Sequence, residues 1–185
     1  AGQRFQAAAA TYQAFVASNP PSDVPTGLEA RAIRAYSKGG FSQLVFQAKR
    51  DYVERYAFPS AYWRTHARSD HPEAVAELET DLRDVATYDH ATAQRTGDVR
   101  EYAEAARWYR EYLDSFPTAP DAAKLDHRLA DALFAAKEYA AAAAEYEHAA
   151  YDYPRNPQSE SAGYAALTAY QKAESGLGGQ ALADL

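Results

Sequence analysis

Apolar side chains recur at intervals of three and four residues along most of the chain, which is the spacing of one face of an α-helix. Residues 3–18 give the first case, in which Phe5, Ala8 and Tyr12 fall on one face. This helix is predicted to end in the segment 19–23, which contains consecutive prolines, because proline cannot continue a helix.

The same spacing predicts further helices, each closed by proline, glycine or a short polar turn. They span residues 26–38, 41–56, 73–95, 99–116, 121–136, 138–153 and 159–174. The stretch 59–70 is less regular, and only 61–64 is predicted to be a short helix there. Since no segment alternates apolar and polar residues as a strand does, the chain is predicted to be all-α.

One signature recurs along these helices with a fixed internal spacing. Tyr102, Ala105, Tyr109 and Pro117 reappear 37 residues later as Tyr139, Ala142, Tyr146 and Pro154, and Phe5, Ala8, Tyr12 and Pro20 repeat the same offsets. A fixed period of this size is typical of stacked repeats, in which each unit buries its apolar face on its neighbour. In the helix 41–56, either Leu44 or Ala48 is the position at which another helix packs closely.

The second copy of this signature resembles the tetratricopeptide repeat. The residues that carry the resemblance are Leu129, Ala130, Leu133, Tyr139, Ala142, Tyr146 and Pro154. In such a repeat the small side chain lets two helices approach, the aromatic fills the gap to the next helix, and the proline ends the second helix. The resemblance implies a right-handed α-solenoid of antiparallel helix pairs. The resemblance covers residues 99–174, is weaker in 3–58, and is interrupted in 59–96.

Three short stretches are similar to the repeats of bacterial envelope proteins, including outer-membrane-assembly lipoproteins and the periplasmic partner of the Tol system. They are Trp108–Pro117, Leu129–Leu133 and Tyr151–Pro154. The resemblance implies a periplasmic or outer-membrane-associated location, with membrane attachment only through an anchor outside this sequence. A cytoplasmic location is the alternative.

The domain organisation predicted from these patterns has four parts. They are N-terminal repeat-like helices in 1–58, irregular connecting helices in 59–98, repeats in 99–175, and a linker or truncated helix in 176–185. The chain contains no methionine, even at position 1, and opens directly in helical sequence. We therefore expect a processed protein or a segment of a longer one.

The resemblance also implies a binding surface, because the first helix of each repeat lines a concave groove. The residues expected to line it, called here the predicted strip, are His90, Gln94, Lys124, His127, Asp131, Phe134, Tyr164 and Thr168. Our hypothesis is that this strip holds an extended peptide or a partner helix. The alternative is a solvated face without a ligand. Tyr62 and Trp63, in the irregular middle segment, form a second candidate interface, since aromatic residues are enriched at binding hot spots.

Charge and composition argue against several other functions. The net charge is −7 and no cluster of lysine and arginine stands out, so nucleic acid is not an expected partner. The absence of cysteine excludes disulfides and thiolate metal sites. The carboxylates of Glu77, Asp81 and Asp84 fall on one helical face, a pattern typical of a solvated surface.

Motifs for metal or catalytic chemistry are also lacking in the sequence. None of the five histidines forms a His-Glu-x-x-His motif, and there is no Gly-x-Ser-x-Gly motif. No metal, cofactor or catalytic residue is therefore expected, although His90 and His127 would approach each other across stacked helices. The sequence predicts a non-catalytic scaffold or adaptor that binds a protein or peptide. The alternatives are a self-associating repeat protein, paired through its terminal repeats, and a docking module of a larger envelope enzyme.

Overall fold

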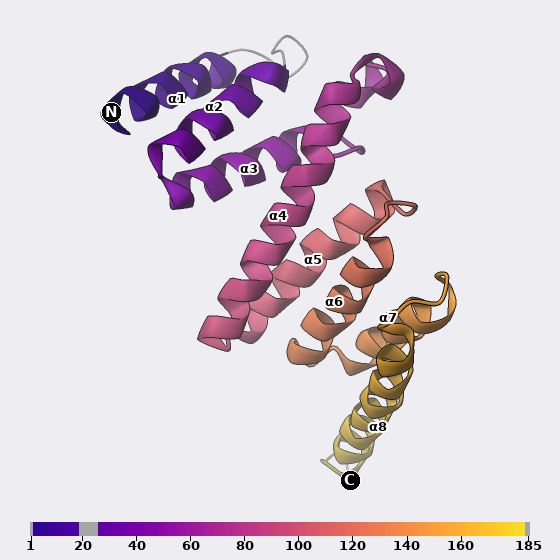
Figure 1. Ribbon diagram of the computed structural model, residues 1–185. Coiled ribbons are helices and arrows are strands. Elements are labelled where there is room, and N and C mark those ends of the chain that lie inside the picture. Colours follow the sequence, from indigo (N-terminus) through magenta and orange to yellow (C-terminus); the bar gives the residue numbers. More distant parts are fainter. Residues whose placement is uncertain (1, 19–25, 184–185) are drawn as a thin grey trace. The chain divides into compact units, whose positions relative to one another are not determined.

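The computed structural model describes residues 2–18 and 26–183, and within these ranges the regular secondary structure is all helical, without strands (Figure 1). The α-helices are α1 (Gly2–Ala17), α2 (Thr26–Gly39), α3 (Ser42–Tyr56), α4 (Pro72–Thr96), α5 (Val99–Ser115), α6 (Ala122–Ala135), α7 (Tyr139–Tyr151) and α8 (Ser159–Ala183). Two single turns of 3₁₀-helix, η1 (Tyr62–Arg64) and η2 (Arg68–Asp70), lie between α3 and α4.

These bounds confirm the predicted all-α class and the helices expected from the apolar spacing. The short helix expected at 61–64 is the 3₁₀ turn η1. The sequence pattern ends the last helix at Glu174, but α8 continues to Ala183. The proline-rich break at 19–23, with Pro20 of the first signature, lies outside the described residues.

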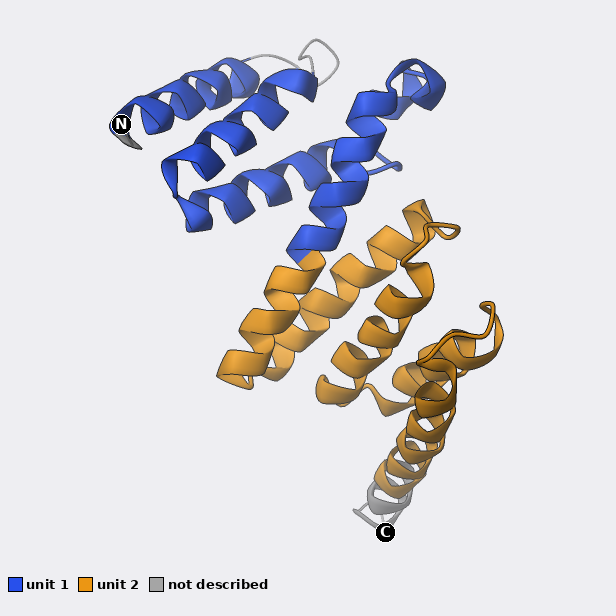
Figure 2. Cartoon of the chain, viewed as in Figure 1, with its two compact units in different colours: residues 1–85 blue, residues 86–185 orange. Residues whose placement is uncertain are grey.

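The chain divides into two compact units, residues 1–85 and 86–185 (Figure 2). The boundary falls inside α4, whereas the sequence-based division places its boundaries after 58, 98 and 175. The reason is that the apolar spacing runs through α4 without interruption, so nothing in the pattern indicates a change of packing partners after Val85.

In the first unit, α1 packs on α2 and α2 packs on α3. Ala48 is buried and Leu44 is exposed, so Ala48 is the close-packing position in α3. In α1, Ala9 is fully buried while Ala8 and Tyr12 are only half-buried. The first copy of the signature therefore does not place its alanine in the core.

A buried ion pair lies in the same unit, on the α4 face that the sequence predicted to be solvated. Asp81 is 0% exposed, and Lys49 Nζ of α3 lies 2.8 Å from Asp81 Oδ1 and 2.6 Å from Asp84 Oδ2. The interpretation of this stripe as a solvated face is wrong for Asp81. Its carboxylate is accommodated because Lys49 supplies a compensating charge.

In the second unit, the alanine and tyrosine positions of the signature that lie 37 residues apart have similar surroundings. Ala105 and Ala142 are both 0% exposed. The rings of His90 and Tyr109 have centroids 5.7 Å apart at 78°, and those of His127 and Tyr146 are 5.4 Å apart at 75°. The sequence period therefore corresponds to a repeated packing geometry, in which a histidine contacts the edge or face of a tyrosine from the following helix.

The turn between α6 and α7 places Lys137 at φ 66°, a left-handed conformation that costs a residue with a Cβ roughly 1–2 kcal/mol. The corresponding turn after α4 uses Gly97, at φ 72°. We expect Lys137→Gly to raise the free energy of unfolding by about 1 kcal/mol, measured by thermal and urea denaturation. Lys137→Ala retains the Cβ and is the control, so an equal gain in both variants would contradict this explanation.

Candidate functional site

Of the two strip residues on α4, His90 is buried and Gln94 is exposed. His90 is buried, its ring lies against Tyr102 and Tyr109, and its Nδ1 is 3.3 Å from the Tyr109 hydroxyl. Burial lowers the pKa of His90. Gln94 is exposed, and its amide nitrogen lies 3.4 Å from His90 Nε2. His90 therefore mainly packs α4 against α5, and little of its surface faces solvent.

The middle of the strip is a hydrogen-bonded network between α6 and α7. The Tyr146 hydroxyl donates to Asp131 Oδ1 at 2.6 Å, and His127 Nδ1 lies 3.3 Å from Asp131 Oδ2. Burial acts to raise the pKa of Asp131, but hydrogen bonds from His127 and Tyr146 outweigh it and the pKa is lowered. The same contact with Asp131 raises the pKa of His127. His127 and Asp131 are half-buried and Tyr146 is buried, and the polar groups of the three side chains contact one another.

The remaining strip residues differ in exposure. Lys124 and Thr168 are exposed, and Phe134 is half-buried against Tyr139, with ring centroids 5.1 Å apart. Tyr164 of α8 is 70% exposed. The strip therefore mixes the buried His90 and half-buried residues of α6 with side chains exposed on α4, α6 and α8. Whether its eight residues hold one ligand stays a prediction.

The second candidate interface is largely internal. Tyr62 is buried, with its ring stacked on His66 at a centroid distance of 4.1 Å. Trp63 is half-buried, and its indole Nε1 donates to the Tyr56 carbonyl at 2.6 Å. Tyr62 therefore offers almost no surface to a partner, because the turn η1 directs it into the core of its unit.

Several exposed apolar side chains gather between α7 and α8. Among the described residues, seven large apolar side chains are exposed, and four of them surround one groove of about 820 Å³. These four are Tyr151, Tyr164, Leu167 and Tyr170. Such a concentration on one surface is unusual for apolar side chains that serve no contact. We call this surface the α7–α8 groove.

Local contacts hold this groove in shape. The Tyr170 hydroxyl of α8 donates to Glu147 Oε2 of α7 at 2.7 Å, which links the two walls. Gly163 has no side chain where α8 passes Tyr151, and a Cβ there would lie 3.1 Å from the Tyr151 hydroxyl. The glycine thus allows the tyrosine to lie close against the helix.

Of these groove residues, only Tyr164 was predicted. The spacing of Tyr164, Leu167 and Tyr170 by three residues places them on one face of α8, but that pattern does not distinguish an exposed face from a buried one. Tyr151 lies at the end of α7, where the sequence indicated only a repeat-like ending. The apolar spacing of these residues is visible in the sequence, but only the fold shows that their side chains are exposed.

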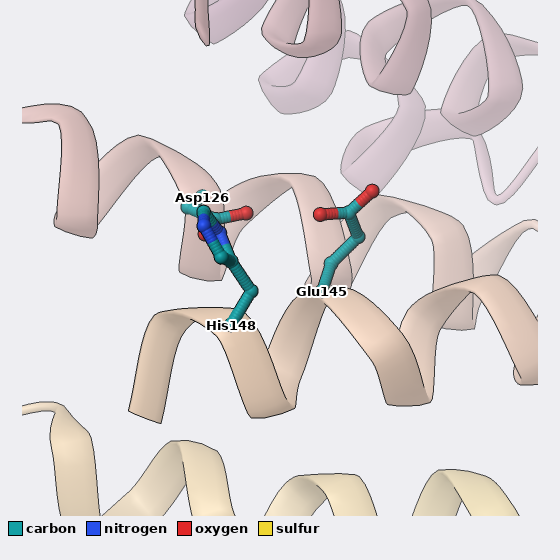
Figure 3. Close-up of side chains that lie close together, drawn as sticks. All are labelled: Asp126, Glu145 and His148. Atoms are coloured by element: carbon teal, nitrogen blue, oxygen red, sulfur yellow. The ribbon is translucent and has the colours of Figure 1, made fainter. Parts of the chain in front are cut away.

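One group of side chains has the chemistry to hold a metal ion. Asp126 of α6 and Glu145 and His148 of α7 present ligand atoms that all lie within 4.8 Å of one another (Figure 3). His148 Nδ1 contacts Asp126 Oδ2. Burial raises the pKa of Asp126 to about 6, even though His148 lowers it. The sequence motif His-Glu-x-x-His does not find this group, because the pair on α7 has the spacing Glu-x-x-His and the third residue lies on another helix.

Comparisons with known proteins give no relative from which a function can be inferred. The chain matches no family model, no curated protein and no solved structure. In the described part of the chain, each helix is too short or too polar to span a bilayer. The function is therefore inferred from the residues and geometry of the chain itself.

Proposed function

We propose that this chain is a non-catalytic scaffold whose α7–α8 groove binds an amphipathic helix of a partner protein. The observation that supports the proposal most strongly is the exposure of Tyr151, Tyr164, Leu167 and Tyr170 around one groove. Tyrosine is enriched among the residues that dominate binding energy, since it has a large apolar ring and a polar hydroxyl. Covering these side chains would remove apolar surface from water.

A helix is the favoured occupant because helices already cover the equivalent surfaces within this unit. Tyr109 of α5 covers His90 of α4, and Tyr146 of α7 covers His127 of α6. Tyr164 lies 37 residues after His127, and its side chain is 70% exposed. An amphipathic helix with anchors at i, i+3 or i+4 fits a groove between two helices, and here it would supply the missing aromatic contact to Tyr164.

Charge helps to define the partner. The groove rim carries Glu147, Glu160 and Arg155, and the chain has a net charge of −7. A second copy of the chain would bring the same negative charge, and an anionic membrane would also be repelled. We therefore propose a partner helix with basic residues beside its apolar face. Self-association is the outcome to be excluded by sedimentation.

The scaffold is proposed to be a tetratricopeptide-type solenoid. Its support is the matching His–Tyr geometry in α4–α5 and α6–α7, together with the fully buried Ala105 and Ala142. A bacterial envelope location is proposed from the resemblance of the repeats alone. The chain would then act as an adaptor, or as the docking module of a larger envelope protein.

A displayed library of amphipathic helices tests the binding proposal even though the natural partner is not identified. Helices selected on the wild-type chain are expected to be basic and to bind Leu167→Glu about 30-fold more weakly, since the loss of a hot-spot residue costs about 2 kcal/mol or more. Leu44→Glu is the matched control, because it places the same charge at an exposed leucine outside the groove. Selected helices that bind all three proteins equally would contradict the proposal, as would a library that yields none.

A further inference from the structure

The group formed by Asp126, Glu145 and His148, called here the Asp126 cluster, shares no residue with the α7–α8 groove. The two adjoin at Tyr153, which lines the groove and packs on His148. Glu145 and His148 are three residues apart on α7 and therefore lie on the same helical face. Asp126 faces them from α6. A Glu-x-x-His pair on one helix facing a carboxylate on another is an arrangement that helical bundles use for metal ions.

Asp126 has an unsatisfied oxygen inside this cluster. The residue is 0% exposed, and its Oδ1 has no hydrogen-bond partner in the part of the chain that the structure describes. Figure 3 shows carboxylate oxygens of Asp126 and Glu145 directed at each other. A buried carboxylate oxygen is costly without a donor or a cation, and two facing carboxylates repel unless positive charge lies between them.

The cluster is also a departure from the internal repeat. The residues 37 positions earlier are Asp89, Trp108 and Glu111. Trp108 is 1% exposed, so the position of Glu145 is one that the preceding unit fills with a large apolar ring. A charged residue at a packing position departs from the rule that such positions carry apolar side chains. Departures of this kind concentrate at functional sites.

We propose that Asp126, Glu145 and His148 bind a divalent transition-metal ion, with Zn²⁺ as the best match, and that the ion ties α6 to α7. One imidazole nitrogen and two carboxylate oxygens form a ligand set that Zn²⁺ accepts, and the fourth position is left for water. Magnesium and calcium prefer oxygen ligands alone. The partial exposure of His148, whose side chain is 46% accessible, gives the ion a route from solvent.

The orientation of His148 suits this role. Its Nδ1 faces Asp126, while its Nε2 lies 3.8 Å from Asp152 Oδ2. The nitrogen opposite a metal-bound nitrogen commonly faces a carboxylate, which orients the ring and raises its basicity. Tyr153 packs on the same imidazole, with ring centroids 5.0 Å apart, and limits its rotation.

Isothermal titration with ZnCl₂ and thermal unfolding with and without Zn²⁺ test the site. We expect one saturable Zn²⁺ site per chain and a melting temperature that rises with Zn²⁺ concentration. Glu145→Gln, which is nearly isosteric, and His148→Asn, which removes the imidazole, are each expected to weaken binding by at least about 10-fold. Circular dichroism of each variant without metal shows whether the fold is retained, so that lost binding is assigned to lost ligands.

A second pair of histidines provides the control. His66 and His71 have ring centroids 5.1 Å apart in the first unit and would give adventitious binding if any imidazole pair sufficed. His66→Asn is expected to bind Zn²⁺ like the wild-type chain. The proposal is overturned if the wild-type chain shows no saturable binding. It is also overturned if Glu145→Gln and His148→Asn retain wild-type affinity, or if binding is lost in His66→Asn.

Discussion

At pH 8, changing Lys49 to methionine is expected to lower the free energy of unfolding of the first unit by about 3–5 kcal/mol. Lys49 Nζ lies 2.8 Å from Asp81 Oδ1, and the Asp81 side chain is 1% exposed. Methionine has a similar length and preserves the packing of the lysine stem, but it leaves a buried carboxylate without its cation. The loss is therefore electrostatic rather than steric.

The same substitution should cost much less at low pH. Burial raises the pKa of Asp81 from its ordinary value of 3.8 to about 7, although Lys49 lowers it. The folded protein holds the Asp81 proton more tightly than the unfolded chain does, so protonated Asp81 favours the folded state. This contribution to stability is fully present below pH 3.8 and is lost as the pH rises through about 7. Without Lys49 the carboxyl stays protonated to higher pH, so we expect a loss of only about 1 kcal/mol at pH 5.

Urea denaturation of both proteins at pH 5 and pH 8 measures this difference. Lys38→Met is the control, because Lys38 is an exposed residue on α2, and it should change stability by less than about 0.5 kcal/mol at either pH. A Lys49→Met variant that loses the same stability at both pH values would show that the charge of Asp81 is not what Lys49 compensates.

Truncation of the two repeated tyrosines, Tyr109→Ala and Tyr146→Ala, is expected to cost about 3–5 kcal/mol each. Both rings are buried, at 0% and 5% exposure, and each contacts a histidine in nearly the same geometry. Because the two positions have equivalent surroundings, their costs should agree within about 1 kcal/mol.

Chemical denaturation measured by circular dichroism provides the comparison. Tyr164→Ala removes the same ring from a position that is 70% exposed, so its expected cost is below about 0.5 kcal/mol. If Tyr109→Ala were severe and Tyr146→Ala nearly neutral, the two helix pairs would not be energetic equivalents. The solenoid interpretation of the second unit would then lose its main support.

The helices of this chain could be predicted from sequence because apolar spacing and proline or glycine stops are local signals. The period of 37 residues likewise identified Ala105 and Ala142 as matched positions, and both are fully buried. The boundary within α4 was not predictable, since it depends on which residues each half of the helix contacts.

The burial of charged residues could not be predicted from sequence, because a helical stripe of carboxylates has the same spacing whether it faces water or another helix. Asp81 was therefore assigned to a solvated face, and only the position of Lys49 on α3 reveals why it is buried. Asp126 and Glu145 lie on different helices, so their approach depends on tertiary register. In the groove, Tyr164 was predicted from the sequence, whereas the exposure of Leu167 is known only from the fold.

Amide hydrogen exchange of the chain, with and without a helix selected on it, tests the central claim most directly. We expect slower exchange confined to residues 147–170, which span the α7–α8 groove, and no such protection in Leu167→Glu. Protection centred on His90, His127 and Asp131 instead, or no protection anywhere in the second unit, would contradict it.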